Sequence, residues 1–146
     1  MRIVFVMGPA CAGKSTFIKK HFPDFYKVDL FDFQTDFMSV DMVMKSYEDC
    51  KNALIDAIKT HENIVLEHTL LKAIRRKVYI DAVKEITDIP IEAYFIYPSD
   101  EELKENSLKR KIKVDTWTLK NYRETAEVPT KNEGFVSVML ITNNEN

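Results

Sequence analysis

Short apolar runs alternate with longer segments of helical periodicity along this chain of 146 residues. The runs are rich in β-branched and aromatic residues, which is typical of buried strands. They predict strands at residues 2–7, 26–30, 64–66, 91–97 and 134–142. Helical spacing and capping residues predict helices at 15–21, within 35–61, at 70–86, from 100 onward, and from 115 or 116 to about 126. The pattern leaves open whether 35–61 forms one helix or two.

The order of these elements predicts the fold class. Strands that alternate with helices form a parallel sheet whose two faces are both covered by helices. We therefore expect an α/β protein with about five parallel strands. No internal repeat and no linker rich in proline, glycine or serine interrupts the sequence. We expect residues 1–146 to form a single domain.

Composition and charge narrow the function classes. Hydrophobic residues make up 45% of the chain and charged residues 30%, a balance that excludes disordered and collagen-like proteins. The net charge of −2 disfavours tight non-specific nucleic-acid binding, although a local patch could hold a strand end. Cys11 and Cys50 are too few for a disulfide framework. The apolar run at 3–7 is too short for a membrane span or a signal peptide, which predicts a soluble, cytoplasmic protein.

The segment after the first predicted strand carries the main chemical signal. It fits the phosphate-loop (P-loop) pattern G-x-x-x-x-G-K-[ST] in full with Gly8, Pro9, Ala10, Cys11, Ala12, Gly13, Lys14 and Ser15, and Thr16 follows. In such a loop, backbone N–H groups surround the phosphates, the lysine contacts the β- and γ-phosphates, and the serine hydroxyl binds Mg²⁺. A strand before the motif and a helix after it are the required context. We therefore predict that residues 8–16 bind ATP phosphates together with Mg²⁺.

A small kinase is the class of P-loop protein that fits this length. A GTPase needs Asp-x-x-Gly after its third strand, but Gly134, the one glycine beyond the P-loop, follows no such aspartate. Motor and AAA-type ATPases need a far longer chain. Glu67 ends the apolar run 64–67, from where its carboxylate could reach the Mg²⁺ shell through water. Ser15 and Glu67 are therefore the predicted metal-binding residues.

Several further segments resemble the small P-loop kinases grouped around the polynucleotide kinase domain, the zeta-type toxins and chloramphenicol phosphotransferase. These segments are 25–28, Thr69 with Arg75 and Arg76, 102–110, and 114–122, and the similarity is greatest to the polynucleotide 5′-kinase domain. The resemblance implies a nucleoside-kinase-like P-loop fold with a small lid at about 107–116. It also implies ATP- and Mg²⁺-dependent transfer of the γ-phosphoryl group to an acceptor hydroxyl.

The resemblance assigns catalytic roles to four residues. Lys14 would stabilise the charge on the phosphates. An aspartate just after the second strand would act as general base on the acceptor hydroxyl, and both Asp29 and Asp32 stand there. We favour Asp32. Arg110 falls in the expected lid, where it would contact the transferring phosphate when the lid closes over ATP.

The predicted acceptor-binding residues match the family pattern less completely than the P-loop does. The resemblance implies that Thr69, Arg75 and Arg76 bind the acceptor. Two positions depart from the family pattern, because Gln34 and Asn106 stand where the family prefers arginine. Neither can make a charged bidentate contact with a phosphate.

Two questions stay open at this point. The acceptor can be the 5′-hydroxyl of a polynucleotide, a nucleoside or nucleotide, or a small metabolite. The missing arginines also allow a protein of another class, a non-catalytic ATP-binding regulatory module with a degenerate acceptor site. Such a module would bind MgATP without transferring phosphate to any acceptor.

Overall fold

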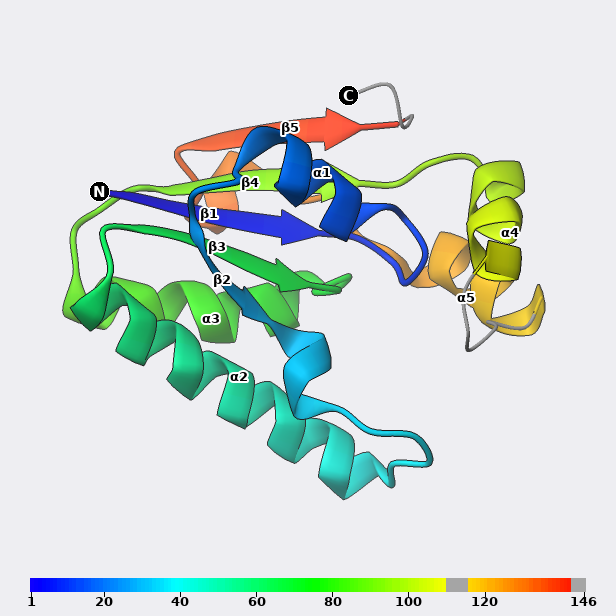
Figure 1. The fold of residues 1–146 in the computed structure, drawn as a ribbon, viewed down its shortest axis with the longest axis horizontal. Coiled ribbons are helices and arrows are strands. Elements are labelled where there is room, and N and C mark those ends of the chain that lie inside the picture. Colours follow the sequence, from blue (N-terminus) through cyan, green and yellow to red (C-terminus); the bar gives the residue numbers. More distant parts are fainter. Residues whose placement is uncertain (110–115, 143–146) are drawn as a thin grey trace.

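The computed structural model describes residues 1–109 and 116–142, which form strands and helices in alternation (Figure 1). The strands are β1 (Arg2–Met7), β2 (Tyr26–Asp29), β3 (Asn63–His68), β4 (Ile91–Ile96) and β5 (Ser137–Ile141). The α-helices are α1 (Lys14–His21), α2 (Val40–Thr60), α3 (Ala73–Ile86), α4 (Asp100–Lys109) and α5 (Thr116–Thr125). Two short 3₁₀-helices are η1 (Leu30–Phe33) and η2 (Lys131–Glu133).

The five strands form one parallel sheet in the order β2-β3-β1-β4-β5. The apolar run that predicted the first strand lies at the centre of this sheet. Each residue from Ile3 to Met7 is 0% exposed, as expected for a parallel strand that is buried on both faces. The chain moves from β1 to the β2–β3 side and then returns to the β4–β5 side. The strand order therefore reverses beside β1. Ligands of α/β sheets bind outside the carboxyl ends of the strands at such a point.

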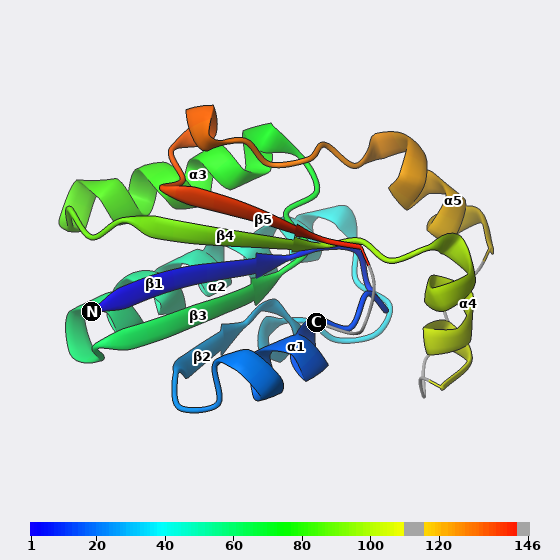
Figure 2. The same ribbon diagram turned by 90° about the horizontal axis from the view of Figure 1, so that it is seen from above.

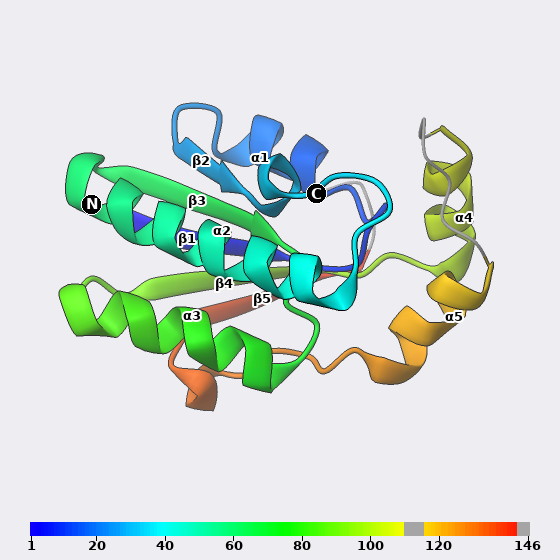
Figure 3. The ribbon, with the colours of Figure 1, turned by 90° about the horizontal axis from the view of Figure 1, so that it is seen from below.

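Helices cover both faces of the sheet, which confirms the predicted fold class. Helices α2 and α3 lie on one face and α1 on the other, as the views from above and below show (Figures 2 and 3). Phe17 of α1 and Phe22, which follows it, each pack 5.4 Å from the ring of Tyr94 on β4. Helices α4 and α5 lie beyond the carboxyl ends of the strands (Figure 2). Among the helices of the described residues, none combines the length and the apolar character needed to cross a membrane.

The segment predicted as helical over 35–61 contains one helix that begins later than the pattern indicated. Ser39 caps α2, because its hydroxyl accepts a hydrogen bond from the backbone N–H of Met42 at 3.2 Å. Residues before this cap are therefore outside the helix. The last strand likewise begins at Ser137 rather than at 134, because η2 extends to Glu133 and is followed by its C-cap Gly134, which has a φ of 124°.

Candidate active site

The P-loop connects β1 to α1 at the carboxyl edge of the sheet. Gly8 has a φ of 149°, and a Cβ atom placed on it would lie 2.2 Å from the backbone oxygen of Ile96. The neighbouring strand therefore leaves no room for a side chain at this position. Gly13 adopts the left-handed conformation with a φ of 97° directly before α1, which glycine does at least cost. The loop can thus turn tightly and end at a helix N-terminus, an arrangement that binds phosphate.

Lys14 bridges the two ends of its own loop. Its Nζ atom donates hydrogen bonds to the backbone oxygens of Gly8 at 2.7 Å and Pro9 at 3.0 Å. These contacts hold the ammonium group against the loop backbone. Phosphate oxygens could replace the two carbonyl oxygens as partners and would interact more strongly with the charge.

A polar cluster next to the P-loop joins residues from three elements. The Ser15 hydroxyl lies 2.8 and 3.0 Å from the two carboxylate oxygens of Glu67. The ammonium group of Lys27 lies 3.3 Å from Glu67 Oε1 and 3.5 Å from Asp29 Oδ2. Strand register explains this meeting, because Asp29 at the end of β2 pairs with Glu67 on β3. The structure therefore places the two predicted metal-binding residues in direct contact.

Lys27 supplies the positive charge in this cluster. Burial acts to lower the pKa of Lys27, but the carboxylates of Glu67 and Asp29 together raise it by more, so the pKa is raised overall. The side chain is therefore charged at neutral pH and offsets part of the negative charge of the two carboxylates. Lys27 could not be identified from local sequence, since its contact with Glu67 depends on the pairing of β2 with β3.

The donor atoms in this cluster fit Mg²⁺. The ion prefers oxygen ligands and usually combines one or two protein groups with water and substrate phosphates. The hydroxyl of Ser15 and the carboxylate of Glu67 are such groups. Across residues 1–109 and 116–142, no three His, Cys, Asp or Glu side chains come together as a metal site. Water and phosphate oxygens of a bound nucleotide would complete the coordination.

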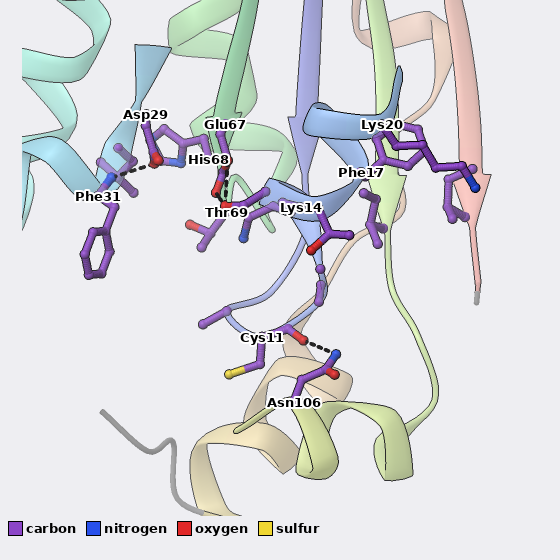
Figure 4. A pocket seen from close by; sticks show the side chains of 18 of the residues that line it. Cys11, Lys14, Phe17, Lys20, Asp29, Phe31, Glu67, His68, Thr69 and Asn106 are labelled. Atoms are coloured by element: carbon purple, nitrogen blue, oxygen red, sulfur yellow. Dashed lines mark hydrogen bonds between the residues drawn. The ribbon is translucent and has the colours of Figure 1, made fainter. Parts of the chain in front are cut away.

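A cavity of about 690 Å³ runs along the P-loop. Asp29 and Phe31 lie on one side of the loop, and Phe17 and Lys20 lie on the other (Figure 4). The residues at the end of β3 line the space between them, and these are Glu67, His68 and Thr69. Ile96, Ile141 and the α4 residues Asn106 and Lys109 also line the cavity.

The structure reverses the preference between the two candidate bases. Asp29 lines the cavity, whereas Asp32 is exposed and is not among the lining residues. The cause is the turn of η1, which begins directly after β2. Asp29 caps this turn by accepting a hydrogen bond from the N–H of Phe31 at 3.0 Å. Asp32 lies within the turn and faces solvent, so the geometry favours Asp29 as the candidate base, and the role of either carboxylate stays a prediction.

Arg76 does not line the cavity, and its guanidinium group is engaged elsewhere, which argues against the predicted acceptor role. The residue is 0% exposed, it forms an ion pair with Glu133, and Nη1 donates to the Leu70 oxygen at 2.8 Å. Arg76 therefore joins α3 to η2. Its neighbour Arg75 is exposed on α3, lies 6.0 Å from the Tyr47 ring and does not line the cavity.

Of the remaining predicted site residues, Thr69 lies at the cavity and Arg110 falls outside the described part of the chain. Thr69 lines the cavity, and its backbone oxygen accepts a hydrogen bond from the N–H of Gly8 at 3.1 Å. Its contact with the acceptor stays a prediction. Arg110 lies outside the described residues, as does the central part of the lid predicted at 107–116.

The burial of Arg76 leads to a stability prediction. Replacing Arg76 with alanine should lower the free energy of unfolding by about 3 kcal/mol, because the partly buried Glu133 would lose its ion-pair partner. Arg75→Ala is the matched control and should change stability by less than about 0.5 kcal/mol. Urea denaturation would measure both. A stable Arg76→Ala variant with weaker acceptor binding would instead restore the acceptor role.

The structure shows two features of the cavity wall that the sequence did not predict, the contact made by Asn106 and the burial of His68. The side-chain amide of Asn106 on α4 donates to the backbone oxygen of Cys11 at 2.8 Å and so connects α4 to the P-loop (Figure 4). His68 is 1% exposed, and burial, with a smaller contribution from the charge of Lys14, lowers the pKa of His68 to about 3. The imidazole is therefore neutral at pH 7. Its position between Glu67 and Thr69 was the available signal.

The chain has a curated relative that is similar in sequence over part of its length. No family model matches the chain. The chain is similar to a bifunctional polynucleotide phosphatase/kinase of Schizosaccharomyces pombe, with 27% identity over 101 residues. The match covers 66% of this chain and 24% of that protein, so this chain spans about a quarter of the length of the curated relative it matches.

Solved structures show the fold. A gluconokinase from Sinorhizobium meliloti 1021 superposes with a TM-score of 0.70 at 16% identity, covering 99% of this chain and 84% of that one. A chain of the Pnkp1/Rnl/Hen1 RNA repair complex superposes with a TM-score of 0.66 at 17% identity, covering 86% of this chain and 46% of that one. The chain therefore has the fold of the P-loop kinases, which confirms the fold that the resemblance implied.

Proposed function

We propose that this protein is a kinase that uses ATP and Mg²⁺ to phosphorylate the 5′-hydroxyl end of a polynucleotide. The observation that carries the proposal is the cavity that joins the P-loop to the carboxylate of Asp29. Donor and acceptor must approach the transferred phosphoryl group from opposite sides, and this cavity reaches both sides of the P-loop. The similarity to a polynucleotide phosphatase/kinase supports a polynucleotide as the acceptor.

The proposed donor site occupies the side of the cavity that Phe17 lines. Residues 8–16 would bind the phosphates of ATP, and the apolar side chains of Phe17, Ile96 and Ile141 would contact its nucleoside. We further propose that residues 1–146 act as one kinase domain and that Arg110 approaches the phosphates from a lid at about 107–116. Ser15 and Glu67 would hold Mg²⁺, which supplies charge neutralisation at the phosphates.

The proposed transfer follows from the residues on the two sides of the P-loop. Asp29 orients the acceptor hydroxyl and accepts its proton as the hydroxyl oxygen forms a bond to the γ-phosphorus. The bond from that phosphorus to the β–γ bridging oxygen breaks, and ADP leaves. Lys14 stabilises the negative charge on the transferring group. Lys27, between Asp29 and Glu67, keeps the two carboxylates close together despite their like charge.

A transfer assay tests the proposed function directly. Labelled γ-phosphate from MgATP would be offered to a 5′-hydroxyl oligonucleotide, nucleosides, nucleoside monophosphates and hydroxylated sugar acids. The same oligonucleotide with a 5′-phosphate is the matched control, because it lacks the acceptor hydroxyl. We expect label on the 5′-hydroxyl oligonucleotide alone.

The other outcomes of this assay are informative. Label on a nucleoside or a sugar acid would support kinase activity but show that the acceptor is not a polynucleotide. MgATP binding without transfer to any acceptor would favour the regulatory module, in line with Gln34 and Asn106. Gln34 is already engaged, since its amide donates to the Ser46 hydroxyl at 3.2 Å. Absence of MgATP binding would overturn the donor site as well.

Phe31 offers a prediction on the acceptor side. This ring lines the cavity next to Asp29 and is 59% exposed, so a base of the acceptor can stack on it. Stacking contributes roughly 1–3 kcal/mol per base, and Phe31→Ala should raise the oligonucleotide KM about tenfold while the ATP KM stays unchanged. Phe37→Ala is the control, because Phe37 is fully exposed and is not a lining residue. The same oligonucleotide KM in Phe31→Ala and Phe37→Ala would contradict the stacking role of Phe31.

A further inference from the structure

Asn106 contacts the P-loop from a distant part of the chain. This residue of α4 lines the cavity, and its side-chain amide donates a hydrogen bond to the backbone oxygen of Cys11 at 2.8 Å (Figure 4). The same peptide unit is bound at its other end, because the N–H of Ala12 donates to the backbone oxygen of Pro9 at 3.2 Å. Both polar groups of the peptide between Cys11 and Ala12 therefore have partners, and the partner of its carbonyl lies 95 residues further along the sequence.

The backbone conformation of Cys11 explains why this contact matters. Cys11 has a φ of 71°, in the left-handed region that favours glycine. The two P-loop glycines, Gly8 and Gly13, also have positive φ values, and they adopt them at little cost because they lack a Cβ atom. Cysteine adopts this conformation only at a cost in free energy. The hydrogen bond from Asn106 to the Cys11 carbonyl offsets part of that cost.

The packing of α4 fixes the direction of the Asn106 side chain. Residues three and four positions apart share one face of a helix, so Asn106 lies on the same face as Leu103 and Ser107. Leu103 is 0% exposed and Ser107 is 4% exposed, so this face packs against the rest of the protein. The beginning of α4 is bound as well, because the guanidinium group of Arg123 on α5 lies 3.0 Å from the carboxylate of Asp100. The amide of Asn106 is therefore presented to the P-loop from a helix that is held in place.

We propose that Asn106 is a positioning residue for the donor phosphates, because it holds the Cys11 carbonyl against α4 and so keeps the P-loop in its phosphate-binding conformation. The inference rests on the donor site of the proposed function. A carbonyl oxygen that turned toward the phosphates would repel their oxygens, since both carry negative charge. Asn106 stands where the family prefers arginine. Its neutral amide acts on the loop, through Cys11, rather than on the transferring phosphate.

Calorimetric titration with MgATP tests this proposal without an acceptor. Asn106→Ala should raise the Kd for MgATP about tenfold, the effect of losing one hydrogen bond that holds the loop. Alanine is a better helix former than asparagine, so α4 should persist in this variant. Glu105→Ala is the matched control, because Glu105 is the preceding residue of α4, is exposed and does not line the cavity. The Kd of this control should stay within about twofold of wild type.

Substitutions at Cys11 separate positioning of the loop from other roles of Asn106. In a Cys11→Gly background, Asn106→Ala should raise the Kd only about twofold, because glycine adopts the positive φ at little cost. In a Cys11→Ala background, which keeps that cost, the rise should again be about tenfold. Equal factors in the two backgrounds would show a general structural role or a direct contact with the nucleotide, and would overturn the proposal. The same Kd in wild type and Asn106→Ala would overturn it too, whereas absence of MgATP binding to the wild type would overturn the donor site itself.

Discussion

Replacing Lys14 with alanine should lower kcat for phosphoryl transfer by about 10²–10³-fold, the effect of removing one group that stabilises transition-state charge. The ammonium group now binds the backbone oxygens of Gly8 and Pro9. During transfer, we expect it to contact the phosphates instead, where negative charge accumulates. Alanine is a good helix former, so α1 should still begin at this position.

Lys19→Ala is the matched control for this variant. Lys19 is an exposed lysine on the same helix and does not line the cavity. Both variants lose one positive charge, but only Lys14→Ala should lose transfer. Rates with saturating MgATP would be compared, together with MgATP affinity by calorimetry. An active Lys14→Ala variant would contradict the assignment of residues 8–16 as the donor phosphate site.

Local sequence signals were sufficient to predict the fold and the P-loop. The apolar run Ile3–Met7 is long enough for one strand and too short for a buried helix, and the glycine motif follows it directly. The pattern of a P-loop is contained in eight consecutive residues. Its structure needs few long-range contacts, apart from the closeness of Gly8 to β4.

The acceptor side could not be predicted in the same way, because it depends on contacts between distant residues. Arg75 and Arg76 are adjacent in sequence, yet successive residues of a helix point in directions about 100° apart. One therefore faces solvent, and the other meets Glu133, which is 57 residues away. The contact of Lys27 with Glu67 likewise depends on strand pairing. No local pattern in the sequence indicates either partner.

The short turn after β2 explains the reversal between Asp29 and Asp32. The sequence placed both carboxylates near the end of a strand, and a family resemblance could not decide between residues three positions apart. The structure favours Asp29 through η1, which turns the chain directly after this residue. The carboxylate at the strand end thus reaches the cavity, and the one inside the turn does not.

Asp29→Asn should therefore lower kcat by about 10²–10⁴-fold, the usual contribution of a general base. Asparagine has nearly the same shape, and its side-chain oxygen can still accept the hydrogen bond from the N–H of Phe31. The η1 turn should persist, but the side chain can no longer take the proton of the acceptor hydroxyl. Affinity for MgATP should change little, since Asp29 lies on the opposite side of the P-loop from Phe17 (Figure 4).

Asp32→Asn removes the same charge from the same turn and is the matched control. Because Asp32 is exposed and lies outside the cavity wall, its replacement should leave kcat within about twofold of wild type, as expected for a surface site. Single-turnover rates would separate the chemical step from product release. A large loss in Asp32→Asn with an active Asp29→Asn variant would show that η1 rearranges when the acceptor binds and brings Asp32 to the reacting hydroxyl.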